Sequence, residues 1–133
     1  MMKRFGAILL LGVAFSIVGA QPAWAIKDFA DVFAEKYVDN SGNDGLKSAA
    51  AEAKCNVCHY GKSKKNRNDF GKALSKHITK GKASDLKKED PAAAKAAIAE
   101  ALEKALAEKK EGDKTFGDVL KAGMLPGTAP EGE

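Results

Sequence analysis

Two cysteines and a histidine form the densest group of chemically reactive side chains in the sequence. They lie in one run, Cys55-Asn56-Val57-Cys58-His59, with the spacing C-x-x-C-H. This is the spacing of a c-type haem attachment site, in which each thiol adds across one haem vinyl group and the adjacent imidazole becomes the proximal iron ligand. The motif uses both cysteines of the chain. We therefore expect one covalent haem c on Cys55 and Cys58, with its iron bound by His59.

Two other interpretations of the same cysteines compete with haem. A structural zinc site needs four ligands, and His77 is the only further cysteine or histidine in the chain. A redox-active C-x-x-C normally lies in a βαβ unit, and no part of this sequence predicts a strand. Haem is therefore favoured. We expect His59 to be neutral, with its second ring nitrogen held by a nearby backbone carbonyl.

The sequence leaves three possibilities for the opposite, distal side of the iron. Met124 is the only methionine outside the first two residues, and it follows a predicted helix in a short loop. His77 is predicted to share an apolar helix face with Phe70 and Leu74, which would give a bis-histidine haem. The third possibility is an open iron position. The choice affects function, because methionine ligation raises the reduction potential.

The first residues have the pattern of a secretory signal peptide. A short positive start precedes an uncharged apolar run over residues 5–18, and Ala23-Trp24-Ala25 is a small-x-small cleavage signal. The apolar run is shorter than the roughly 20 residues that span a bilayer. We predict a signal peptide over 1–25, a cytochrome c-like domain over 26–126 and a flexible tail over 127–133. The mature protein is expected in the periplasm, without a stable membrane span.

The hydrophobic periodicity predicts helices and no strands. Asn68 or Asp69 can cap one helix, Asp90-Pro91 begins the longest one, and Thr115 with Asp118 forms a capping box. The fold class is therefore all-α, with four to five helices wrapped around one covalently bound haem. The predicted helices cover residues 26–38, 46–54, 69–79, 91–110 and 115–122.

Positive charge is concentrated on the segment that carries the motif. Residues 54–82 contain nine basic residues and one acidic residue, a net charge of +8. Such a surface near an exposed haem edge would attract acidic redox proteins and accelerate their association. Nucleic acid is not an expected partner, because the chain is exported and its basic residues are not interleaved with aromatic ones.

Residues 26–125 resemble a small bacterial c-type cytochrome, and the run Cys55 to His59 is the core of the resemblance. A weaker similarity links the chain to the monohaem class I family, in which a methionine far beyond the motif is the sixth ligand. The resemblance implies that Met124 takes this role and that the protein carries single electrons rather than catalysing a reaction. The alternative is a haem-based gas-binding or peroxidase-like protein with an open distal iron position.

Overall fold

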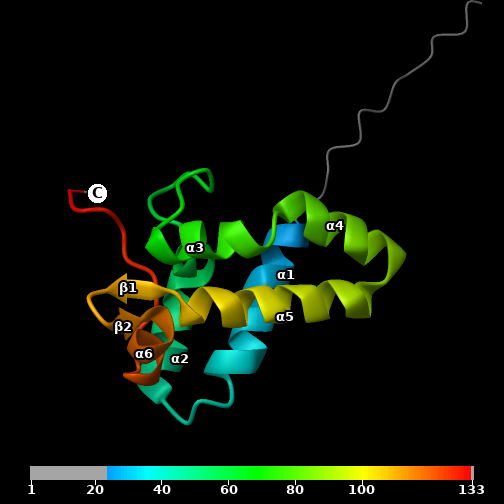
Figure 1. The fold of residues 1–133 in the computed structure, drawn as a ribbon. Helices are drawn as coiled ribbons and strands as arrows, with labels where there is room; N and C mark the ends of the chain where they lie inside the picture. Colours follow the sequence, from blue (N-terminus) through cyan, green and yellow to red (C-terminus); the bar gives the residue numbers. More distant parts are fainter. Residues whose placement is uncertain (1–23, 133) are drawn as a thin grey trace, which may run out of the picture.

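The computed structural model describes residues 24–132, and this part of the chain is mainly helical (Figure 1). The predicted signal peptide, 1–25, therefore lies almost entirely outside the described residues. A π-helical turn follows α1, and a 3₁₀ turn carries the start of the C-x-x-C-H motif. The elements are α1 (Trp24–Phe33), the π-helical turn (Ala34–Val38), α2 (Asp44–Ala53), the 3₁₀ turn (Lys54–Val57), α3 (Asp69–His77), α4 (Lys80–Glu89), α5 (Pro91–Ala107), β1 (Lys109–Glu111), β2 (Lys114–Thr115) and α6 (Phe116–Lys121).

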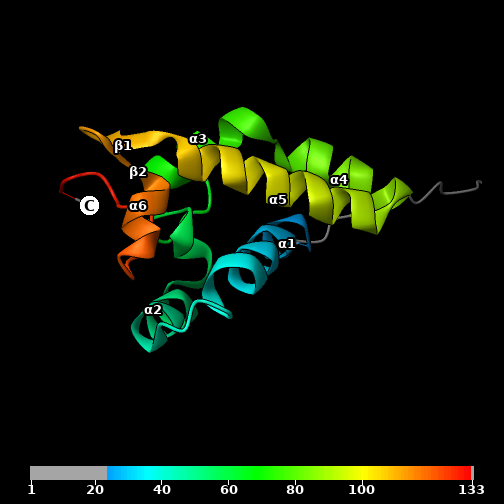
Figure 2. The same ribbon diagram turned by 60° about the horizontal axis from the view of Figure 1, so that its bottom comes forward.

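Helix α5 is the central element of the fold. It contacts α1, α3, α4 and α6, and Figures 1 and 2 show it running between α1 on one side and the α3–α4 pair on the other. Its predicted apolar stripe of Ile98, Leu102 and Leu106 is buried. Alanines at positions 94, 101 and 105 are buried as well, so neighbouring helices can approach this helix closely.

The predicted helix starts are confirmed at three places. Asp90 accepts hydrogen bonds from two backbone N–H groups at the start of α5, with proline in the first turn. Thr115 and Asp118 form the reciprocal capping box of α6. Asn68, rather than Asp69, caps α3.

A chain of aromatic rings connects three helices in the core. Phe70 of α3 is completely buried, with its ring centroid 6.1 Å from that of Phe33 in α1 and 5.4 Å from that of Phe116 in α6. The rings are tilted against one another, as aromatic pairs prefer. Because Phe33 also lines the cavity described below, this core sets the position of the cavity wall.

The predictions of four to five helices and of no strands were wrong, because residues 24–132 contain six α-helices and a two-stranded sheet. The segment Lys80–Glu89 is a helix, α4, that the sequence did not predict. The long helix ends at Ala107 instead of Lys110, and the chain then forms the antiparallel hairpin β1–β2. Gly112 makes the hairpin turn with a φ of +56°, a conformation that suits glycine.

Within residues 24–132, no helix has the length and apolarity needed to cross a membrane.

Candidate functional site

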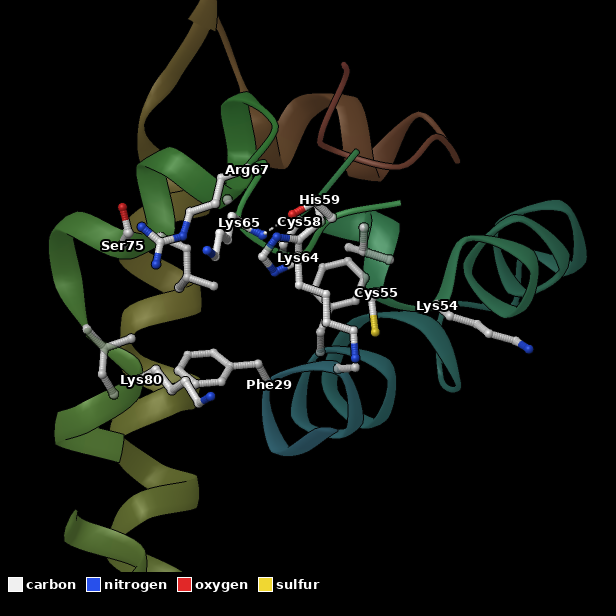
Figure 3. Close-up of a pocket in the computed structure, with 17 residues that line it drawn as sticks. Phe29, Lys54, Cys55, Cys58, His59, Lys64, Lys65, Arg67, Ser75 and Lys80 are labelled. Carbon is white, nitrogen blue, oxygen red and sulfur yellow. Dashed lines mark hydrogen bonds between the residues drawn. The ribbon is translucent and has the colours of Figure 1, made fainter. Parts of the chain in front are cut away.

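A cavity of about 470 Å³ lies beside the C-x-x-C-H motif (Figure 3). This volume is within the range of small-molecule and cofactor pockets, about 300–1,000 Å³. Cys55, Cys58 and His59 all line it, so the structure brings the three predicted site residues together. Its apolar wall comes from α1, the 3₁₀ turn, α3 and the residue after α3, through Phe29, Phe33, Val57, Leu74 and Ile78.

The imidazole of His59 is oriented by the loop that follows it. Nδ1 of His59 is 3.1 Å from the carbonyl oxygen of Asn66, which is the kind of backbone partner expected from the sequence. The same carbonyl accepts a hydrogen bond from the backbone N–H of Tyr60 at 3.2 Å, so its own position is fixed. When the protonated Nδ1 donates a hydrogen bond to the Asn66 carbonyl, Nε2 keeps its lone pair and can bind a metal. Figure 3 shows the ring at the cavity.

The surroundings of Cys58 disfavour its thiolate form. Burial, together with the neighbouring Cys55, raises the pKa of the Cys58 thiol to about 12. In a redox-active C-x-x-C pair, a lowered pKa makes a thiolate available at the attacking cysteine, and Cys58 does not have this property. In the described part of the chain, no group of three or more His, Cys, Asp or Glu residues could hold a metal ion.

The backbone takes an unusual conformation immediately before the first cysteine. Lys54 has a φ of +50°, and it is the only non-glycine residue with positive φ among residues 24–132. Its ψ of −113° matches the first central position of a type II′ turn, which glycine usually occupies. This turn redirects the chain from α2 into the motif and presents Cys55 to the cavity.

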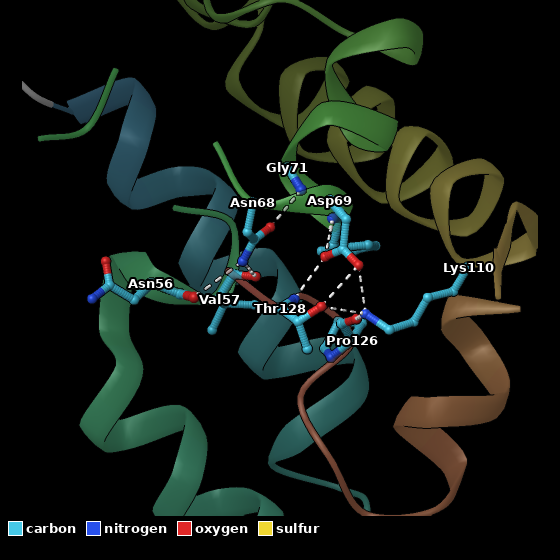
Figure 4. Close-up of polar contacts among 9 residues, drawn as sticks. Asn56, Val57, Asn68, Asp69, Gly71, Lys110, Pro126 and Thr128 are labelled. Atoms are coloured by element: carbon cyan, nitrogen blue, oxygen red, sulfur yellow. Dashed lines mark hydrogen bonds and ion pairs between the residues drawn. The ribbon is translucent and has the colours of Figure 1, made fainter. Parts of the chain in front are cut away.

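Asn68 joins the motif loop to α3, a role beyond the helix cap that the sequence predicts (Figure 4). Its side-chain amide donates to the carbonyls of Asn56 (3.3 Å) and Val57 (3.0 Å), while its Oδ1 accepts from the N–H of Gly71 (2.9 Å). Its backbone N–H also donates to the carbonyl of Cys58 at 3.0 Å. Only 1% of Asn68 is exposed. Asn68 thus holds the backbone between the two cysteines with buried, satisfied hydrogen bonds.

A close approach of two backbones accompanies these bonds. A Cβ atom added to Gly71 would overlap the carbonyl oxygen of Cys58 and would also lie 3.3 Å from Cβ of Arg67. Gly71 is therefore the residue that lets α3 pack directly on the motif. The atom nearest to this glycine's missing Cβ is the carbonyl oxygen of Cys58.

The segment after α6 is bonded to the start of α3. The Asp69 carboxylate accepts hydrogen bonds from the backbone N–H (2.6 Å) and the hydroxyl (3.1 Å) of Thr128, and it pairs with Lys110 at 2.6 Å. Lys110 also donates to the carbonyl of Pro126 at 2.8 Å (Figure 4). The predicted tail, 127–133, thus begins with residues that contact the domain: Thr128 is held by Asp69, and a Cβ at Gly127 would overlap the Asn68 amide.

Neither residue predicted for the distal side reaches the cavity. Met124 is 57% exposed and is not among the lining residues. His77 lies outside the lining as well, because its Nε2 is bound to the Glu108 carboxylate at 2.7 Å. Met124 lies just after α6, and His77 at the end of α3 is held by Glu108, the residue that follows α5. Of the described residues that line the cavity, His59 is the only histidine, and no methionine is among them.

The rim of the cavity is cationic. The lining includes five basic residues, Lys54, Lys64, Lys65, Arg67 and Lys80. Within the described part of the chain, none of the five forms an ion pair with a carboxylate. An apolar cavity with an unneutralised positive rim is suited to a flat, mainly apolar ligand that carries negative groups at its edge.

Comparisons of the chain with protein-family models, with curated proteins and with solved structures found no match.

Proposed function

We propose that the protein is an exported monohaem c-type cytochrome that carries single electrons between redox proteins. The observation that supports this most directly is the cavity that Cys55, Cys58 and His59 line together beside an apolar wall. The two thiols would hold the porphyrin through thioether bonds, and Nε2 of His59 would bind the iron. Haem c supplies a one-electron couple at its iron when it is bound.

In this proposal the chain contributes attachment, orientation and exclusion of water. The Asn66 carbonyl sets the plane of the His59 ring and increases the basicity of Nε2. Asn68 keeps the motif backbone in place, so the two sulfur atoms and the imidazole have fixed relative positions. Phe29 and Leu74 would pack on the porphyrin and reduce its contact with solvent.

The basic segment 54–82 is the proposed docking surface for acidic redox partners. It supplies the cationic rim of the cavity, where a haem edge would be closest to a partner. Docking through such charges makes electron transfer fast at low salt and slower as salt rises. The signal-peptide pattern supports a periplasmic location, where partners of this kind would meet the protein.

The second candidate function is a haem-based gas-binding or peroxidase-like protein. One observation favours it: the described residues that line the cavity include no methionine and no second histidine. An iron held only by His59 would leave its distal position open to a small ligand. An electron carrier normally keeps that position closed.

The proposal is tested on the protein purified from the periplasm of a host that attaches haem. A red protein that retains its pigment in acidified acetone would carry covalent haem, and the Cys55→Ala, Cys58→Ala double variant should lose it. A colourless wild-type protein would refute the proposal. Reversible one-electron reduction without rapid binding of carbon monoxide would support the electron carrier; rapid, stoichiometric binding would favour the second function.

A companion variant tests the distal ligand. Because Met124 lies away from the cavity, Met124→Ala should leave the oxidised spectrum unchanged. A weak band at the red end of the oxidised spectrum that disappears in Met124→Ala would show instead that the methionine binds the iron. His77→Ala provides the matching test of the other sequence-based candidate.

A further inference from the structure

The five cations of the cavity rim are not distributed evenly around the attachment cysteines. In Figure 3, Lys54 lies beyond Cys55 and points away from the cavity, whereas Arg67 and Lys80 lie across the cavity from Cys55. Arg67 comes from the loop before α3, and Lys80 is the first residue of α4. Ser75 of α3 lies on the same far side.

Arg67 has a position that is tied to the proximal histidine. Its backbone forms an isolated antiparallel bridge with His59, and the next residue is the buried Asn68. The base of the side chain is therefore fixed relative to the imidazole, while the side chain itself remains exposed. A guanidinium held in this way presents planar paired donors, which match the geometry of a carboxylate.

Lys80 lies where a helix disfavours positive charge. The first turn of α4 contains Lys80 and Lys82 and no acidic residue. Helix N-termini carry partial positive charge and stabilise anions, so lysines there have an unfavourable interaction with the helix. Lys80 also has no carboxylate partner within residues 24–132. An anion bound at this end of the cavity would offset the unfavourable interaction of Lys80 with the helix N-terminus and would give Lys80 a partner of opposite charge.

The chemistry of haem specifies which anion could lie there. The two vinyl groups occupy one edge of the porphyrin, and the two propionates occupy the opposite edge. If Cys55 and Cys58 hold the vinyl edge, the propionates must extend toward the far side of the cavity. We propose that Arg67 and Lys80 bind the two haem propionate carboxylates. This inference rests on the proposed haem attachment and extends it to the second edge of the cofactor.

The test uses the holoprotein and compares charge-removing with charge-preserving substitutions. The variants are Arg67→Gln, Lys80→Gln and their double, and the conservative pair is Arg67→Lys and Lys80→Arg. Lys54→Gln is the matched control, because it removes one rim cation on the cysteine side. The first readout is the ionisation of the propionates, followed by NMR with carbon-13-labelled haem carboxyls. The second is the midpoint reduction potential at low and high salt.

We expect Arg67→Gln and Lys80→Gln each to raise the titration midpoint of one propionate. Both should also lower the reduction potential, because loss of a nearby positive charge favours the ferric state. The double variant should affect both propionates, and Lys54→Gln should change them little. Lys80→Arg should keep wild-type behaviour, whereas Arg67→Lys keeps the charge but loses the paired donors and should give a smaller shift than Arg67→Gln. If the two Gln variants match Lys54→Gln in both readouts, the inference is refuted.

Loss of haem in the variants is also informative. If the Gln variants accumulate little holoprotein while Arg67→Lys and Lys80→Arg load normally, the charge itself is required for binding, as proposed. If the conservative variants fail equally, the residues act through packing and the inference is wrong. A wild-type protein without covalent haem would refute the proposed function itself, and that result is seen before any variant is made.

Discussion

Gly71 provides the sharpest test of how α3 is packed on the motif. The perturbation is Gly71→Ala, the addition of one methyl group at a buried position of the first turn of α3. The new Cβ would overlap the carbonyl oxygen of Cys58 and lie 3.0 Å from its carbonyl carbon. These are backbone atoms of the motif, held by Asn68, so they cannot rotate away as a flexible side chain could.

The size of the effect follows from two opposing contributions. Replacing glycine by alanine inside a helix stabilises it by about 1 kcal/mol. Overpacking of a tight interface costs typically about 1–3 kcal/mol and occasionally more. Contact between a carbon and a carbonyl oxygen requires roughly 3.3 Å, so α3 and the motif would have to separate by about 1 Å. We expect the overlap to dominate, with a net loss of about 2 kcal/mol in the free energy of unfolding.

Gly81→Ala is the matched control. Gly81 lies in the first turn of α4, and its added Cβ would meet only the Thr79 hydroxyl, at 4.0 Å. This substitution should stabilise the protein by up to about 1 kcal/mol. Urea unfolding of both holoproteins measures the two effects, and the yield of covalent haem reports on the motif. If Gly71→Ala is as stabilising as Gly81→Ala and loads haem normally, the close packing of α3 on Cys58 is refuted.

Three further substitutions test the surroundings of the motif. Asn68→Ala removes a helix cap and leaves the carbonyls of Asn56 and Val57 without their buried donor. The free energy of unfolding should therefore fall by about 3 kcal/mol. A fall below about 1 kcal/mol in urea unfolding would show that the Asn68 amide does not stabilise the motif loop. Asp69→Asn should reduce stability near pH 7 and much less at pH 3. Burial alone would raise the pKa of Asp69, but Lys110 and the N–H groups of Thr128 and Phe70 lower this pKa overall. The carboxylate therefore stabilises the fold above the ordinary carboxyl pKa, and this stabilisation is lost as the pH falls through the pKa of the folded state. Thermal unfolding across this pH range measures the difference, and a variant that tracks the wild type at both pH values would contradict it. Lys54→Gly should stabilise the holoprotein by about 1 kcal/mol, because glycine accepts the positive φ without strain; a loss of stability in calorimetry would mean that the lysine side chain contributes more than the strain removes.

Local signals accounted for much of the helical architecture. The caps at Asn68, Asp90 and Thr115 were predictable because a helix cap is a hydrogen bond between a side chain and the N–H groups two or three residues later. The buried stripe of α5 was predictable from the 3.6-residue period of its apolar residues. Asn43 caps α2 in the same way, by accepting a hydrogen bond from the backbone N–H of Leu46.

Helix α4 and the β1–β2 hairpin could not be found from local patterns. The segment Lys80–Glu89 is strongly polar and lacks an apolar stripe. Its helix is stabilised by packing on α5 and by burial of Ala83 in the core, and neither contact can be read from the local sequence. Residues 108–111 are good helix formers by composition, so the sequence-based prediction placed the end of this helix at Lys110 instead of Ala107. Their course is set by the contacts of the hairpin with α6 and by the bonds of Lys110 to Asp69 and Pro126.

The sequence by itself determined the motif of Cys55, Cys58 and His59 and the concentration of positive charge around it, because covalent spacing and composition are local properties of the chain. The tertiary structure decided which other groups share the cavity. It brought Phe29, Arg67 and Lys80 to the motif. It left outside both sequence-based candidates for the distal side: Met124, proposed from its loop after a predicted helix, and His77, proposed from a predicted apolar helix face. The reason is that a side chain's direction depends on how whole helices pack, and that packing is set by contacts between residues far apart in the chain.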